Sequence, residues 1–325
     1  MPPKDSLPAP TPLDPLACRR AFPDGSAIGS WAAADGWLLR SLRFPLPREA
    51  RGSILFMGGR GDHFEKYLEA FAEWTNAGWC VESFDWRGQG GSGRMGSDPV
   101  VGHADDFRVW IDDLDQYFTA WRARTPGPHF LIGHSMGGHL LLRALADGAI
   151  VPDGAVLSAP MLGFTAPYPD RLGYWIAQMM VRLTEPDRRA WKLSEKPGSP
   201  PAARQGLLTH DGARYADEQF WRTAHPDLAI GPASWQWVAA AYASFLHLAA
   251  SGGVDRIACP VLGLVAGHDL LVSARRARAL LARLPHGQIH VYGREAAHEL
   301  LREADSVRDD VMARISTFME GVSGA

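Results

Sequence analysis

The chain has 325 residues with a formal net charge of −3, 46% apolar residues and 21% charged residues. This is the composition of a globular protein with a sizeable core, and the length suits two domains or one large α/β domain with an insertion. The arginines are scattered and form no basic block, so the charge pattern argues against nucleic-acid binding.

Residues 1–35 are predicted to form a loosely ordered leader. The opening stretch MPPKDSLPAPTPLDPLACRR is rich in proline and polar residues and lacks the apolar run of a signal peptide. No window approaches the roughly 18 consecutive apolar residues of a membrane-spanning helix. The three cysteines, Cys18, Cys80 and Cys259, have no C-x-x-C spacing, which argues against a disulfide framework or a zinc cluster. These features together predict a cytoplasmic protein.

Strand-like and helix-like segments alternate along most of the chain, which predicts an α/β fold with a mostly parallel, doubly wound sheet. Strands are expected at 37–44, 53–57, 79–86, 129–132, 155–158, 260–265 and 288–292, and helices at 63–77, 106–121, 136–146, 273–284 and 297–318. The rhythm breaks at 161–254, which holds prolines, aromatic residues and helical pieces. We therefore predict a core of 36–160 and 255–325 and an inserted helical cap of 161–254.

The segment Gly133-His134-Ser135-Met136-Gly137 matches G-x-S-x-G. The string alone is a weak signal, because five-residue patterns recur by chance. Here it follows a buried strand and precedes a helix, the setting that a nucleophile elbow requires. The flanking glycines leave room for a serine in a strained turn. This context predicts Ser135 as a nucleophile rather than an incidental serine in a glycine-rich turn.

A serine nucleophile needs a histidine base, and an α/β hydrolase places its acid and then its base after the serine in the chain. Of the histidines in this part, His298 follows the last strand, whereas His290 lies inside that strand and His286 at its opposite end. Asp269 directly follows the preceding strand and is the predicted acid. Its alternative role is to cap the next helix, and Asp255 is a second candidate at the wrong end of the strand.

An oxyanion hole needs two backbone N–H donors. Met136, directly after the nucleophile, is one candidate, and Arg60 in the GGRG loop after the strand SILFM is the other. The Arg60 side chain either points outward or meets an anionic group of the substrate. Two other motifs fail: RGQGGSG lacks the full dinucleotide-binding spacing, and HELLRE lacks the second histidine of a zinc motif. No metal or cofactor is predicted.

The segments GGRGDHFEKY, FDWRGQGGSGR, GHADDF, GHSMGG, LSAPMLG, LVAGHD and AAHELLRE resemble the bacterial lysophospholipase (L2-like) and monoacylglycerol lipase branch of the α/β hydrolases. The resemblance runs from about Ser53 to Phe318 and includes HPDLAIGPASWQWV in the cap. It implies an α/β-hydrolase fold, the triad of Ser135, Asp269 and His298, and oxyanion donors at Arg60 and Met136. It departs from the lipases at Gly58, where many of them carry a histidine.

The cap offers the main hint about the substrate. Trp175 and Met179 belong to one apolar helical face and Trp235 to another, and both faces suit an acyl chain. The alternative is that these residues form the cap's own core. A transient contact between the cap and a membrane surface is a lesser hypothesis.

The predicted function is hydrolysis of carboxylic esters of lipid-like substrates, lysophospholipids or monoacylglycerols, through an acyl-enzyme on Ser135. An acyltransferase or a prolyl-type aminopeptidase would use the same triad. The aminopeptidase would need acidic cap residues to hold an amine, and Asp217, Glu218 and Asp227 are available. A non-enzymatic binding protein is the third alternative, against which the intact triad argues.

Overall fold

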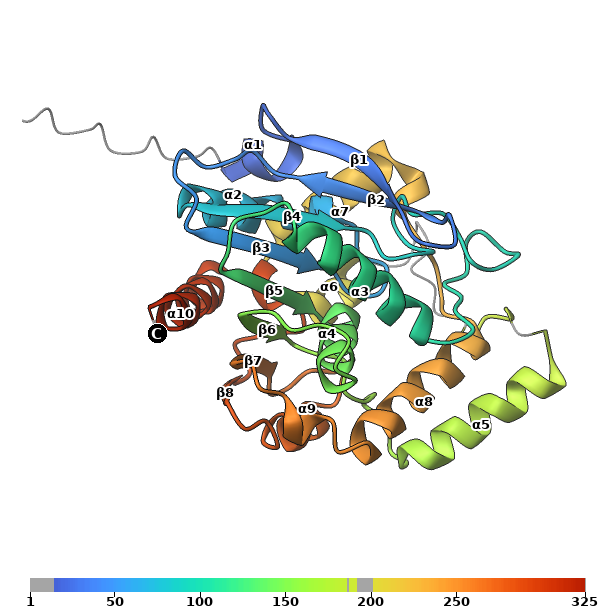
Figure 1. The fold of residues 1–325 in the computed structure, drawn as a ribbon. Coiled ribbons are helices and arrows are strands. Elements are labelled where there is room, and N and C mark those ends of the chain that lie inside the picture. Colours follow the sequence, from blue (N-terminus) through green and yellow to red (C-terminus); the bar gives the residue numbers. More distant parts are fainter. Residues whose placement is uncertain (1–14, 186, 192–200, 325) are drawn as a thin grey trace, which may run out of the picture.

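A computed structural model describes residues 15–185, 187–191 and 201–324 of the chain. Its centre is an eight-stranded sheet with the order β1-β2-β4-β3-β5-β6-β7-β8 (Figure 1). The strands are β1 (Ala27–Ala32), β2 (Leu38–Arg43), β3 (Gly52–Met57), β4 (Trp79–Phe84), β5 (His129–His134), β6 (Gly154–Ser158), β7 (Val261–Ala266) and β8 (Gly287–Tyr292). Strands β1 and β2 are antiparallel to their neighbours, and all other pairs are parallel. The predicted α/β fold with a mostly parallel sheet is confirmed.

Helices cover both faces of the sheet. The longer ones are α1 (Pro15–Arg20), α2 (Leu68–Asn76), α3 (Arg108–Arg122), α4 (Met136–Ala146), α5 (Asp170–Leu183), α6 (Pro201–Leu208), α7 (Gly212–Ala224), α8 (Trp235–Ala250), α9 (Ala274–Leu281) and α10 (Asp305–Ser323). Short 3-10 turns are η1 (Phe64–Tyr67), η2 (Pro226–Leu228), η3 (Val254–Arg256) and η4 (Leu300–Arg302).

The side chains of the central strands point alternately to the two faces of the sheet and pack into two apolar cores. Leu55 and Met57 of β3 pack into one core with α3, α4, α8 and α9, whereas Ile54 and Phe56 pack into the other with α2 and α10. Successive residues of a strand point to opposite faces, so a strand buried on both sides is mostly apolar. Every residue of β3 is buried, and its one polar side chain, Ser53, donates to the Pro126 carbonyl at 2.7 Å.

The sheet begins earlier than the sequence predicts. Residues 27–32, which fall in the expected leader 1–35, form β1 and pair with β2 along their whole length. Residues 15–20 of the same segment form α1, and residues 1–14 lie outside the described residues. Strand β1 is an exposed edge strand and buries almost none of its residues. It therefore lacks the apolar run by which a buried strand is recognised.

The segment between β6 and β7 contributes helices to both faces of the sheet. Helix α8 joins the core of α3 and α4, and α5 packs on α8, where Gly173 lies against the ring of Tyr242. Helix α7 lies across the sheet from them, since its Trp221 belongs to the core of α2 and α10. Figure 1 shows α5 and α8 side by side and α7 behind the sheet, near α1.

Candidate active site

The carboxyl ends of β3, β5, β7 and β8 meet at one edge of the sheet because these strands are parallel. Ser135 directly follows β5, Asp269 lies three residues beyond the end of β7, and His298 lies in the loop after β8. The helix expected from Ala297 onward begins only at Asp305, so the His298 loop is longer than predicted. The topology thus brings three side chains that are far apart in sequence to one point.

Ser135 sits in a sharp turn between β5 and α4. Its φ of 52° and ψ of −114° are sparsely populated for a residue with a side chain. The turn is closely packed, because a Cβ on Gly137 would come within 2.4 Å of the Met57 carbonyl oxygen. A Cβ on Gly133 would meet Gly137 at 2.7 Å. Glycine at both positions is therefore a requirement of this turn.

The three predicted side chains form a continuous hydrogen-bonded chain. His298 Nε2 lies 2.9 Å from Ser135 Oγ, and His298 Nδ1 lies 2.6 Å from Asp269 Oδ2. The other Asp269 oxygen accepts the backbone N–H groups of Leu271 and Val272 at 2.8 and 3.0 Å, which fixes the carboxylate. The geometry lets the histidine share the serine proton while the aspartate orients the ring.

Burial and the charge of the partner shift the pKa values of His298 and Asp269 in opposite directions. Burial lowers the pKa of His298, but the nearby Asp269 carboxylate outweighs it and raises that pKa above 6.5. Burial raises the pKa of Asp269, and the imidazole of His298 brings it below its ordinary value. The ring of His134, 4.9 Å from that of His298 between centres, has its pKa lowered to about 4 by burial and by His298. His134 therefore stays neutral near pH 7.

The loop that carries Arg60 lies directly against the serine. A Cβ on Gly59 would come within 2.9 Å of the Ser135 Cβ. The Gly58 carbonyl accepts the indole N–H of Trp86 at 2.9 Å, and the Gly61 N–H donates to Gln89 at 2.6 Å. Trp86 and Gln89 come from the loop after β4, so the RGQGGSG turn supports this neighbouring loop.

The two predicted oxyanion donors differ in their setting. Met136 is the first residue of α4, where helical backbone N–H groups have no partner within the helix. The Arg60 guanidinium donates to the Gly231 carbonyl and lies 5.4 Å from the ring centre of Trp237. The Arg60 side chain is thus directed at the segment before α8 rather than outward, and its contact with an anionic group of the substrate stays a prediction. Donation from Arg60 and Met136 to a substrate oxygen stays a prediction.

The predicted substrate contacts lie on α5 and α8. Trp175 is 60% exposed on α5, while Met179 and Trp235 are half-buried on α5 and α8. Ser135 itself is only 8% exposed, so the serine is covered in this conformation. The binding of an acyl chain by these three residues stays a prediction.

Sequence reasoning missed the acidic residues that hold the His298 loop. Glu303 is fully buried and accepts the N–H of Ala297 at 2.7 Å and that of His210 at 3.1 Å. Glu299, next to His298, pairs with Lys66 at 2.7 Å. The string HELLRE contains Glu299 and Glu303, but its pattern does not indicate this role. Among the described residues, no group of His, Cys, Asp or Glu is arranged to hold a metal ion.

The strand order and the serine turn at the end of β5 define an α/β-hydrolase fold. The chain belongs to the Hydrolase_4 family, described as "Serine aminopeptidase, S33", whose model matches residues 48–305. Within the described residues, no helix is long and apolar enough to cross a bilayer.

Known proteins with similar sequences and structures support the predicted branch. Lysophospholipase L2 of Escherichia coli strain K12 is 27% identical over 301 residues, covering 89% of this chain and 86% of that protein. The probable lysophospholipase L2 of Haemophilus influenzae is 26% identical over 275 residues, covering 83% and 84%. A soluble variant of the Saccharomyces cerevisiae monoglyceride lipase, solved with a substrate analogue, is 18% identical with a TM-score of 0.72, covering 97% and 99%. The predicted resemblance and the class of serine ester hydrolase are confirmed.

Proposed function

We propose that the protein cleaves carboxylic esters of lipid-like substrates, lysophospholipids or monoacylglycerols, through an acyl-enzyme on Ser135. The observation that carries this proposal is the hydrogen-bonded chain from Ser135 Oγ through His298 to Asp269, with distances of 2.9 and 2.6 Å. The similarity to lysophospholipases and monoglyceride lipases supports the lipid part of the proposal.

In the proposed reaction, His298 takes the Ser135 proton as the serine oxygen attacks the ester carbonyl. The N–H groups of Arg60 and Met136 stabilise the negative oxygen of the tetrahedral intermediate. His298 then gives its proton to the leaving alcohol, and the acyl group remains on Ser135. Water, deprotonated by His298, cleaves this ester and releases the carboxylic acid.

The decisive test replaces the nucleophile. Ser135→Ala should abolish hydrolysis of p-nitrophenyl butyrate and labelling by a fluorophosphonate probe, while leaving the thermal unfolding temperature unchanged. Full retained activity in this variant contradicts the proposal. A panel of monoacylglycerols, lysophospholipids and simple esters then assigns the head group by kcat/KM.

A prolyl-type aminopeptidase is the second candidate, favoured by the description of the matched family. It needs cap carboxylates that are available to a substrate amine. Asp217 pairs with Arg19 and Arg20, and Glu218 is buried among cations. These two carboxylates are therefore already neutralised, which supports the esterase, whereas Asp227, the third candidate, is exposed. Hydrolysis of proline p-nitroanilide at a higher kcat/KM than any ester would reverse this preference, and acyl transfer to an added alcohol would indicate the acyltransferase.

We also propose that α5 touches a lipid surface during catalysis. Leu172, Trp175 and Leu183 lie on one side of the helix and are 44%, 60% and 72% exposed. Such an apolar stripe suits the boundary between lipid head groups and acyl chains. Replacing all three with serine should reduce co-sedimentation with phosphatidylglycerol vesicles and leave p-nitrophenyl butyrate hydrolysis unchanged. Equal sedimentation of both proteins contradicts this contact.

We also propose a cytoplasmic location. Cys80 and Cys259 are free thiols, and free thiols persist in a reducing compartment. Fractionation of the native host, followed by detection of the protein, tests it.

A further inference from the structure

A buried cluster of ion pairs lies next to the proposed triad and joins three separate segments of the chain. Its carboxylates are Asp62, Glu218 and Glu299, and its cations are Lys66, Arg204, Arg222 and Arg302. Burying this many charges is costly unless each is closely paired. None of them takes part in the proposed chemistry, so their placement needs another explanation.

Lys66 is the member that contacts all three carboxylates. Its ammonium lies 2.5 Å from Asp62, 2.7 Å from Glu299 and 3.2 Å from Glu218, and its side chain is only 1% exposed. Burial lowers the pKa of Lys66, but the three carboxylates outweigh it and raise that pKa above its ordinary value. The side chain is therefore a fixed positive charge at neutral pH.

The first partner, Asp62, controls the loop that carries the proposed oxyanion donor Arg60. One Asp62 oxygen accepts the Gly59 N–H at 2.7 Å and the Tyr67 hydroxyl at 2.6 Å, and the other faces Lys66. Gly59 in turn lies against Ser135. The position of Lys66 is thereby transmitted to the backbone next to the nucleophile.

The second partner, Glu299, belongs to the loop of the proposed base, since it follows His298 directly. Its carboxylate also pairs with Arg302, and its N–H donates to the Leu208 carbonyl at 2.7 Å. The third partner, Glu218, comes from α7 and is fully buried. One ammonium therefore ties the oxyanion loop and the base loop to each other and to α7.

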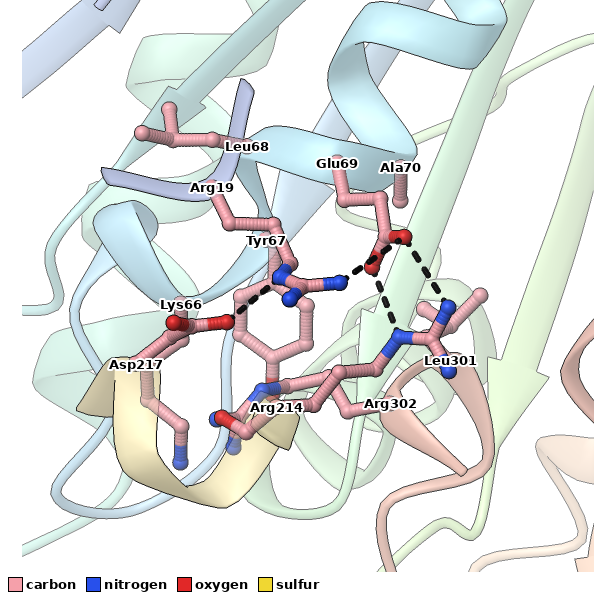
Figure 2. Close-up of a pocket in the computed structure, with 10 residues that line it drawn as sticks. All are labelled: Arg19, Lys66, Tyr67, Leu68, Glu69, Ala70, Arg214, Asp217, Leu301 and Arg302. Atoms are coloured by element: carbon pink, nitrogen blue, oxygen red, sulfur yellow. Dashed lines mark hydrogen bonds and ion pairs between the residues drawn. The ribbon is translucent and has the colours of Figure 1, made fainter. Parts of the chain in front are cut away.

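Figure 2 shows Lys66 and Arg302 beside a second set of ion pairs, in which Arg19 and Arg214 contact Glu69. Arg308 also pairs with Glu73 at 2.7 Å in this part of the molecule, and its side chain is 3% exposed. The contacts of Arg308 go to α2 and α10 and to neither site loop. Arg308 is thus a matched cation, equally buried but without a direct ion pair to either loop.

We propose that Lys66 is a positioning residue for the ester hydrolysis, holding the oxyanion loop and the base loop at the spacing that the transition state requires. This inference rests on the proposed function. A misplacement of catalytic groups by about 1 Å costs on the order of 10²-fold in rate. Because the effect falls on the transition state, it appears in kcat more than in KM.

The main test is Lys66→Met, which keeps most of the length of the side chain and removes its charge. We expect kcat for p-nitrophenyl butyrate to fall on the order of 10²-fold, the loss typical of a disturbed oxyanion hole, with little change in KM. The matched variant Arg308→Met should lower the unfolding temperature and leave kcat unchanged. An unchanged kcat in folded Lys66→Met overturns the proposal, as does an equal loss of kcat in both variants.

A charge-conserving variant separates positioning from charge balance. Lys66→Arg keeps the positive charge, but its larger planar guanidinium does not fit the place of an ammonium that lies 2.5, 2.7 and 3.2 Å from three carboxylates. The spacing of the two loops should therefore change, and kcat should fall although the charge is kept. Full kcat in Lys66→Arg shows that Lys66 only supplies a charge and overturns the proposal. If Lys66→Met does not fold, Lys66→Arg decides alone.

The Ser135→Ala result keeps this inference separable from the function itself. If Ser135→Ala is inactive and Lys66→Met is fully active, the hydrolase assignment stands and the positioning role fails. If Ser135→Ala retains activity, the proposed function fails before Lys66 is tested.

Discussion

The two halves of the segment between β6 and β7 differ in how they are held. Helix α5 packs on α8 and exposes the apolar side chains of Leu172, Trp175 and Leu183. Helix α7 buries charged side chains, and its Glu218 is fully enclosed by cations of the core. The two halves therefore differ in what they bury: α5 leaves an apolar stripe at the surface, whereas α7 places a buried carboxylate among the cations beside the candidate active site.

The same segment also contacts the loop of the proposed base through backbone hydrogen bonds. The N–H groups of His298 and Glu299 donate to the carbonyls of Leu207 and Leu208, at the end of α6. Segments held by buried polar networks open at high free energy, whereas exposed helices with few partners open at low free energy. We therefore expect α5 to move during substrate entry while α6 and α7 stay in place.

The largest effect is expected from Asp269→Asn, which removes the negative charge beside the proposed base His298. The Asp269 charge raises the pKa of His298 above 6.5, and the base must be neutral to act, so wild-type activity falls as the pH drops through this raised pKa. Without the charge the pKa of His298 falls, so the acid limb of kcat/KM moves to lower pH. The loss of orientation lowers kcat on the order of 10⁴-fold.

A pH–rate profile of both proteins measures the two changes, and the triple serine variant of α5 is the control. Its profile should match the wild type, because α5 supplies no group that raises or lowers the pKa of His298. An acid limb that stays in place in Asp269→Asn contradicts the assigned acid. An acid limb that moves in the α5 variant shows instead that the two halves are coupled.

The second prediction compares one residue from each half for stability. Glu218→Ala removes a buried carboxylate that pairs with Lys66, Arg204, Arg222 and Arg302, and should lower the free energy of unfolding by about 3–5 kcal/mol. Trp175→Ala removes an exposed side chain and should change that free energy by less than about 0.5 kcal/mol. Urea denaturation at pH 7 measures both values. Similar losses in the two variants would remove the energetic distinction between the two halves.

The positions of Ser135, Asp269 and His298 followed from the sequence because topology governs them. Residues directly after parallel strands share one edge of the sheet, so three short apolar runs were enough to place them together. The partners of Lys66 had no such signal. Glu218 and Glu299 lie 152 and 233 positions further along the chain, and only the packing of α7 and of the His298 loop decides that they meet.

The sequence also could not predict that the segment between β6 and β7 divides, with α5 and α8 on one face of the sheet and α7 on the other. A helix pattern shows that one side of α7 is buried, but Trp221 carries no information about which face of the sheet it will cover. Strand β1 was missed because AIGSWA lies at an exposed edge and shows no apolar alternation. Local sequence patterns therefore predicted the buried central strands, but neither the exposed edge strand β1 nor the face of the sheet that α7 covers.

The smallest of the three expected differences is between two helical glycines, one from each half. Replacing glycine by alanine inside a helix usually stabilises, and Gly206→Ala in α6 meets no atom within 4 Å, so it should stabilise by about 0.4–1 kcal/mol. A Cβ on Gly173 would come within 2.3 Å of the Tyr242 ring, which Phe164 and Phe245 hold in place. Gly173→Ala should therefore destabilise by about 1–3 kcal/mol as α5 moves away from α8.

Activity distinguishes what that displacement means. If α5 is only a cover, Gly173→Ala should leave kcat for p-nitrophenyl butyrate unchanged, because the hydrogen bonds of Ser135, His298 and Asp269 join loops of the sheet and not α5. Hydrolysis of long-chain monoacylglycerols should change in KM, since Met179 lies on the displaced helix. A fall in kcat for the short ester as large as that of Lys66→Met would place α5 in the fixed part of the active site and erase the difference between the two halves.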